Sequence, residues 1–187
     1  MSFLSLVGVE FKKIKRSKIF LILFAATLIL WIPSILNADM NFNMQAEGIS
    51  PENNFFIQGF MGMAWFMFPA SMVVGTVLLS QTERTNKGIL KMLALPISTV
   101  KLCLAKFVVL LALAASQILM MVGMYYISAA IVTGTQDYNF ILSPLFVFKE
   151  VGFIAVSTIP MLAFFWLLAV CIQTPIFSIG IGLASIV

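Results

Sequence analysis

Histidine is absent from this chain of 187 residues, and charged residues make up only 10% of it. The missing histidine removes the commonest metal ligand and the commonest general base. Soluble globular proteins carry roughly 25% charged residues, whereas 61% of this chain is hydrophobic. Because so little charge cannot cover a water-facing surface, most of the surface must face lipid. The composition therefore indicates an integral membrane protein.

Cysteine is scarce as well, and the motifs of an enzyme are missing. Cys103 and Cys171 lie far apart without CxxC spacing, so we expect small buried apolar residues in a reducing compartment rather than a disulfide or metal pair. No GxxxxGK[ST] pattern is present, so the chain is not expected to hydrolyse ATP. The apolar runs offer no paired acids and no nucleophile with a base. We expect no catalytic site, no metal and no cofactor in this chain, and the lack of intramembrane acids disfavours an ion-coupled transporter.

What the chain does contain is a series of long apolar runs. A membrane-crossing helix needs about 20 apolar residues, and candidate spans cover about 19–37, 55–80, 104–133 and 151–171. A fifth apolar run begins at Pro175 and stops at Val187. These runs predict an all-α polytopic transmembrane bundle over residues 19–187. Since the fifth run is too short to cross, we expect the chain to be truncated within that span.

The charged residues are distributed unevenly between the loops. Five of the eleven basic residues precede the first span and five more lie in 81–106, whereas 38–54 holds three acids and no base, and 134–150 holds two acids and one lysine. Lysine and arginine concentrate on the cytoplasmic side of membrane proteins. The N-terminus and the loop that follows the second span are therefore predicted to be cytoplasmic, and the other two loops external.

Residues 1–18 are amphipathic if they form a helix. Apolar residues recur at helical spacing, while Glu10, Lys13 and Arg16 fall on another side; the apolar set is Phe3, Leu6, Val7, Phe11 and Ile14. One interpretation is an elbow helix that lies flat in the inner membrane interface with its lysines near anionic headgroups. The other is a basic flank that orients the first span, and the two are compatible.

The loop at 81–103 is both charged and apolar. Its start, "QTERTNKG", is polar, and "ILKMLALP" can form two helical turns with an apolar stripe that Pro96 ends. Ser98 or Thr99 can then cap the next helix. The loop is either an ordinary positive-inside loop or a short helix that presents leucine and methionine to a groove on a soluble partner.

Two segments resemble the permease subunits of ABC-2 type transporters. They are "VEFKKIKRSKIF" before the first span and "TERTNKGILKMLALPISTVKLCLAKF" after the second. The likeness extends through "IPMLAFFWLLAVC" and "CIQTPIFSIGIGLAS" over nearly the whole chain. Within that superfamily the chain is most similar to the lantibiotic-immunity branch, whose small permeases expel antimicrobial peptides.

The resemblance implies a bacterial plasma-membrane permease of about six spans that works as part of an ATP-driven exporter. Its implied partners are a cytosolic ABC ATPase that holds the ATP and Mg²⁺, a second permease (identical or a sister subunit), and a peptide or other amphipathic substrate; no nucleic acid is expected. The 81–103 loop would carry a coupling helix, and the residues implied at the ATPase contact are Glu83, Arg84, Gly88, Leu90, Leu95, Pro96 and Ser98. The alternative is a non-transporting membrane scaffold or sensor subunit.

A few polar and small residues fall inside the apolar runs. Gln58 and Gln117 are expected to face the bundle interior, either as interhelical hydrogen-bond partners or as residues of a substrate path. Gly180 and Ala184 form a small-xxx-small step in the fifth run. That pattern suits close helix packing.

Overall fold

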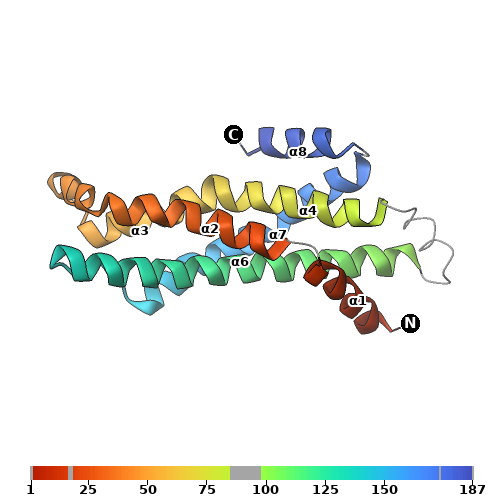
Figure 1. Cartoon of the computed structure of the whole chain (residues 1–187), viewed down its shortest axis with the longest axis horizontal. Coiled ribbons are helices and arrows are strands. Elements are labelled where there is room, and N and C mark those ends of the chain that lie inside the picture. Colours follow the sequence, from red (N-terminus) through yellow and green to blue (C-terminus); the bar gives the residue numbers. More distant parts are fainter. Residues whose placement is uncertain (1, 17–18, 85–97, 173, 187) are drawn as a thin grey trace.

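A computed structural model describes residues 2–16, 19–84, 98–172 and 174–186 of the chain. Every regular element in these residues is helical, which confirms the all-α prediction. The elements, shown in Figure 1, are α1 (Phe3–Arg16), α2 (Ile19–Leu36), the 3₁₀ helix η1 (Ala38–Glu47), α3 (Pro51–Gly62), the π-helical turn η2 (Met63–Met67), α4 (Phe68–Arg84), α6 (Thr99–Gln136), α7 (Pro144–Cys171) and α8 (Pro175–Ala184).

Four of the described helical stretches are long and apolar enough to cross a membrane. They are α2, the run from Pro51 to Gln81, α6 and α7, and they match the four predicted spans. With 38 residues, α6 is about 57 Å long at about 1.5 Å per residue, so it extends well beyond roughly 30 Å of hydrocarbon. The 10 residues of α8 are too few to cross.

Three helices begin earlier than the apolar runs suggested. Pro51 and Pro144 each occupy the first turn of a helix, directly after Ser50 and Ser143. Proline suits this position because the first N–H groups of a helix have no intrahelical partner. The third of these helices is α6, which starts at Thr99 after its N-cap Ser98. The Ser98 hydroxyl accepts a hydrogen bond from the Lys101 backbone N–H at 3.4 Å. The predicted cap is thereby confirmed.

The helix that starts at Pro51 passes through a π turn in its middle. Pro69 has no N–H to donate to the carbonyl of Trp65 four residues earlier, which an α-helix would require. At η2 the chain instead widens by one residue, and the Phe68 N–H donates to the Met63 carbonyl. The helix therefore continues past the proline instead of breaking.

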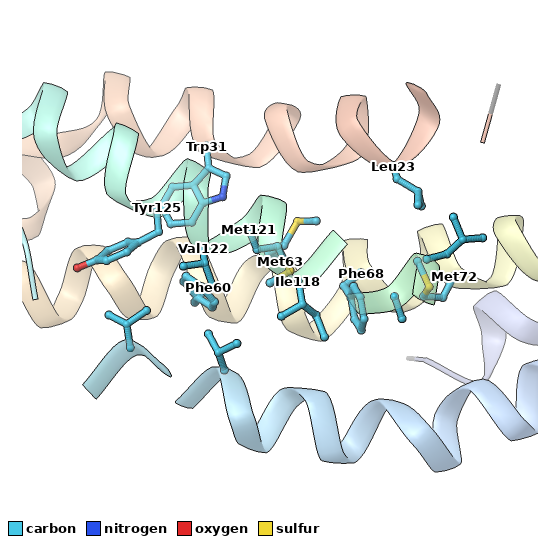
Figure 2. Close-up of a cluster of buried hydrophobic side chains, with 14 of the residues drawn as sticks. Leu23, Trp31, Phe60, Met63, Phe68, Met72, Ile118, Met121, Val122 and Tyr125 are labelled. Carbon is cyan, nitrogen blue, oxygen red and sulfur yellow. The ribbon is translucent and has the colours of Figure 1, made fainter. Parts of the chain in front are cut away.

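The interior is built around α6, which packs against α1, α2 and α7, while α4 packs against α7 and α8. On α2 a single stripe at four-residue spacing is buried, formed by Ile19, Leu23, Thr27 and Trp31. Figure 2 shows two residues of this stripe, Leu23 and Trp31, beside buried side chains of α3, η2, α4 and α6; the others labelled are Phe60, Met63, Phe68, Met72, Ile118, Met121, Val122 and Tyr125.

A glycine allows the closest approach in this core. A Cβ atom on Gly59 would lie 2.5 Å from the Trp31 ring atom Cζ3. The indole, itself fully buried, is also surrounded by Phe55, Phe60 and Tyr125, with ring centroids 5.9–6.0 Å away. The α2–α3 contact therefore depends on a residue without a side chain at position 59.

Two expectations about small residues are wrong. Cys103 and Cys171 are free but exposed on the bundle surface, not buried, because a lipid-facing position accepts the same residue types as a core position. In α8 the close contact is made two residues away from the predicted step: Ser178 and Gly182 are buried. A Cβ on Gly182 would lie 2.7 Å from Val73 Cγ1, whereas nothing lies near Gly180.

Candidate functional site

The two ends of the bundle differ in charge. Figure 1 shows α1, the C-terminal end of α4 and the N-terminal end of α6 at one end, and η1 with residues 137–143 at the other. We call the first the basic end, defined by Lys12, Lys13, Lys15, Lys101 and Lys106. The second is the acidic end, defined by Asp39, Glu52, Asp137 and Glu150. The described basic residues named here thus lie at one end and the acidic ones at the other, as the positive-inside prediction requires, although Lys149 lies next to Glu150.

A buried ion pair joins α1 to α6 at the basic end. The Lys106 ammonium lies 3.4 Å from the Glu10 carboxylate, and the two side chains are 3% and 2% exposed. Lys13 contacts the other oxygen of Glu10 at 2.6 Å. Leu6 and Ile14, one turn before and after Glu10, are buried beside it. The face of α1 that packs on α6 therefore carries a charge at its centre.

Two predictions from the sequence are wrong at this pair. Helical spacing predicts Glu10 on the polar side of the N-terminal helix, and the charge distribution predicts Lys106 among the loop cations. In the structure both are interior, because each supplies the counter-charge that lets the other leave water. Of the predicted apolar face, Leu6 and Ile14 are buried, whereas Phe3 and Phe11 are exposed. The interfacial position of α1 stays a prediction.

The residues predicted at the ATPase contact lie at the basic end or beyond the described part of the chain. Glu83 and Arg84 are the last residues of α4, and Ser98 is the N-cap of α6. Gly88, Leu90, Leu95 and Pro96 lie outside the described residues. The structure therefore places the two borders of this segment, and the role of its residues stays a prediction.

The two glutamines predicted inside the bundle have different surroundings. Gln117 is fully buried, and its Oε1 accepts a hydrogen bond from the Ser71 hydroxyl of α4 at 2.7 Å. The interhelical prediction is thus confirmed for this residue. Gln58 is exposed and donates to Asn54 Oδ1 of its own helix at 3.4 Å, so the interior prediction is wrong there. The structure does not bring the two side chains together.

Hydrogen bonds connect the helices and the α6–α7 connection at the acidic end. The Tyr138 hydroxyl donates to the Glu52 carboxylate, and this bond raises the pKa of the phenol above its ordinary value. The Tyr125 hydroxyl donates to the Phe140 carbonyl and accepts from the Leu142 N–H, at 3.2 and 3.0 Å. These bonds tie the α6–α7 connection to α6 and to the start of α3.

Sequence reasoning missed a groove between α3 and α7 that opens on the side of the bundle. Its volume is about 390 Å³, within the usual range for small-ligand sites of roughly 300–1,000 Å³. Apolar side chains form its walls, and Asn53 and Glu150 lie in its lining toward the acidic end; the main apolar residues are Phe56, Ile57, Phe60, Phe146, Phe153 and Ile154. No sequence pattern predicts this groove, because its lining comes mainly from two helices that are far apart in the chain.

The surface chemistry defines the class of protein. Large apolar side chains are exposed along α2, α7 and α8, including Leu21, Phe153 and Ile176. A soluble protein rarely exposes apolar patches of this extent, and fully hydrogen-bonded helices are the structures that cross a bilayer. No group of three potential metal-binding His, Cys, Asp or Glu side chains occurs among the residues that the structure describes. The chain is a polytopic helical membrane protein.

Comparison with known proteins narrows this class to a family. The model of the ABC-2 family transporter proteins matches residues 6–187, and the chain belongs to that family. Neither the search of curated proteins nor the search of solved structures gave a match. Membership makes the chain the membrane permease component of an ABC transporter and implies an ABC ATPase subunit as its partner.

Proposed function

We propose that this permease belongs to an exporter of the bacterial plasma membrane that expels a lantibiotic-type antimicrobial peptide, or another amphipathic molecule, and so protects the cell. The observation that carries the proposal is the family match over residues 6–187. The finer resemblance of its two basic segments to the lantibiotic-immunity branch adds the substrate class. The second permease of the complex is a further copy of this chain or a sister subunit.

The ATPase is proposed to dock at the basic end, on the 81–103 loop. This is supported by the arrangement of α4 and α6, which both have their ends there and so border the loop. Ser98 caps α6 directly after the loop, and α6 packs against α1, α2 and α7. A push on the loop would therefore move a helix that packs against α1, α2 and α7.

Co-purification tests the proposal. The tagged full-length protein is purified in mild detergent from its host, and the bound subunits are assayed for ATP hydrolysis. Leu90→Asp and Leu95→Asp should remove a stoichiometric ATPase while leaving membrane insertion intact. Ile141→Asp is the matched control, because it adds the same charge at an exposed apolar residue of the acidic end.

Transport is read in the same strains from survival in a lantibiotic. Export predicts that the Leu90 and Leu95 variants lose protection together with the ATPase, while the Ile141 variant keeps both. If no ATPase purifies with the intact protein, the permease proposal is wrong and a scaffold or sensor subunit explains the chain better. If the ATPase is present but survival is unchanged by either variant, the substrate class is wrong.

A further inference from the structure

The α3–α7 groove has polar groups of one kind at one end. Glu150 contributes a carboxylate, and Asn53 contributes an amide whose Nδ2 donates to the Ser50 hydroxyl at 2.8 Å. This bond uses one of the two N–H groups of the amide and holds the side chain in place, and the amide carbonyl oxygen can accept a hydrogen bond from a ligand. Both groups are therefore hydrogen-bond acceptors, and one of them is negatively charged.

The charge around this end has the same sign. Asp39, Glu52 and Asp137 belong to the same end of the molecule, and Lys149 is the one basic residue in the sequence between 134 and 150. A phospholipid headgroup brings a phosphate, which this field repels. An ammonium group is attracted by the field and supplies the hydrogen-bond donors that the two acceptors need.

The rest of the groove suits an apolar body. Phe56 and Phe146 meet across it with ring centroids 5.8 Å apart, and Met61 and Phe153 are 63% exposed on its borders. Because these borders lie on membrane-capable helices, the groove is open to lipid from the side. Its volume of about 390 Å³ holds one small amphiphile or a few side chains of a peptide, not a whole peptide.

We propose that the α3–α7 groove is a binding site for a cationic amphiphile, which enters from the lipid with its ammonium group at Glu150 and Asn53 and its apolar body along the phenylalanines. The identification of this ligand with the transported substrate rests on the function proposed above. The binding site itself does not depend on that function. A membrane-bound cation taken up here would be held at the acidic end, away from the end where the ATPase docks.

Photo-crosslinking tests the site directly. The probe is dodecylamine that carries a diazirine on its alkyl chain, and it is added to the purified protein in nanodiscs of zwitterionic lipid without ATPase. Mass spectrometry should locate the crosslinks on the α3 and α7 peptides. The matching alkyl alcohol and alkyl phosphate probes should label these peptides weakly.

Two variants separate the role of the groove carboxylate from that of the general field. Glu150→Gln should weaken competition by unlabelled dodecylamine about fivefold, as expected for a partly exposed charge contact. Asp137→Asn removes a charge at the same end outside the groove lining, at a left-handed residue with φ of 50°, where asparagine is well tolerated. Because Asp137 contributes to the field but does not line the groove, this control should change labelling much less than Glu150→Gln does.

The alternatives give different patterns. If the alcohol probe labels as strongly as the amine probe, the groove is filled by acyl chains without regard to charge. If the phosphate probe labels more strongly than the amine probe, the groove is a phospholipid site. Either result overturns the proposal. The crosslink positions in the unaltered protein decide this even if a variant fails to fold. The crosslinking sample contains no ATPase, so its result does not depend on the co-purification test with Leu90→Asp. Either experiment can succeed while the other fails, and failure of the groove proposal is therefore distinguishable from failure of the proposed function.

Discussion

At the residue scale, the Glu10–Lys106 pair shows how a membrane protein keeps a charge inside a helix contact. The pair lies near the basic end of α6, and α6 is longer than the bilayer requires. The charges are therefore buried by protein near the edge of the membrane and not placed in the hydrocarbon centre. Lys13 adds a second cation to the same carboxylate. The contact is specific, because Glu10 has a defined place between Leu6 and Ile14.

Removing one member of this pair should destabilise the protein more than removing both. Glu10→Gln removes the carboxylate that faces the buried Lys106 ammonium and is expected to cost about 3 kcal/mol. Lys106→Met should cost less, because Lys13 still contacts the Glu10 carboxylate. The double variant Glu10→Gln/Lys106→Met should recover part of that loss. Thermal unfolding in detergent measures all three, with Lys15→Met on the exposed side of α1 as the control. Additive losses in the double variant would show that the two residues act independently.

Gly59 and Gly62 offer a matched pair on one helix. Gly59→Ala should lower the unfolding midpoint, because its new methyl group overlaps the buried Trp31 ring and overpacking costs about 1–3 kcal/mol. Gly62→Ala has open space around its Cβ and should be neutral or slightly stabilising, as alanine favours helices. Trp31→Phe should rescue the Gly59 variant. Equal effects at both glycines would point to backbone flexibility as the cause.

At the scale of the elements, the sequence predicted the type and approximate position of the four membrane-capable helices well. Runs of about 20 apolar residues have few alternatives to a helix in lipid. The Ser98 cap could also be predicted, because capping depends only on residues close in the sequence. The boundaries are predicted less accurately, because the apolar runs place Pro51 and Pro144 in the loops. In fact proline begins both helices.

Which face of each helix points inward could not be predicted from the same runs. Lipid and protein interior select the same side chains, so α2 shows no apolar stripe in its sequence even though only one face of it is buried. The exposed cysteines and the shift from Gly180 to Gly182 in α8 have this cause. The groove between α3 and α7 could not be predicted from the sequence, because it depends on how these faces are oriented.

The α4–α8 contact can be tested through its tightest point. Gly182→Leu should displace α8, because a Cβ there already lies 2.7 Å from Val73 Cγ1, and the unfolding midpoint should fall. Gly180→Leu, on the same helix but with no neighbour within 4 Å, should leave the midpoint nearly unchanged. Val73→Ala should restore part of the loss caused by Gly182→Leu. An unchanged midpoint for Gly182→Leu would mean that α8 does not pack at this place.

At the scale of the whole molecule, the segregation of charge to opposite ends predicts orientation. In a cysteine-free background (Cys103→Ser, Cys171→Ser), Asp39→Cys should react with a membrane-impermeant maleimide on intact cells. Lys101→Cys should react only after the cells are opened. Both native side chains are exposed, so accessibility in the folded protein is not limiting. The reverse labelling pattern would invert the topology and would place the ATPase loop on the wrong side of the membrane.

The packing of α8 against α4 also has a consequence for the order in which the helices assemble during synthesis. During synthesis α4 leaves the ribosome before α6 and α7, and α8 follows all of them. The surface around Val73 that contacts Gly182 therefore stays uncovered by α8 at first. It faces lipid or an insertion factor while two further long helices enter the membrane. Closure of this seam is a late step of assembly, and a chain that fails at it would reach the quality-control proteases of the membrane with its four long helices already inserted.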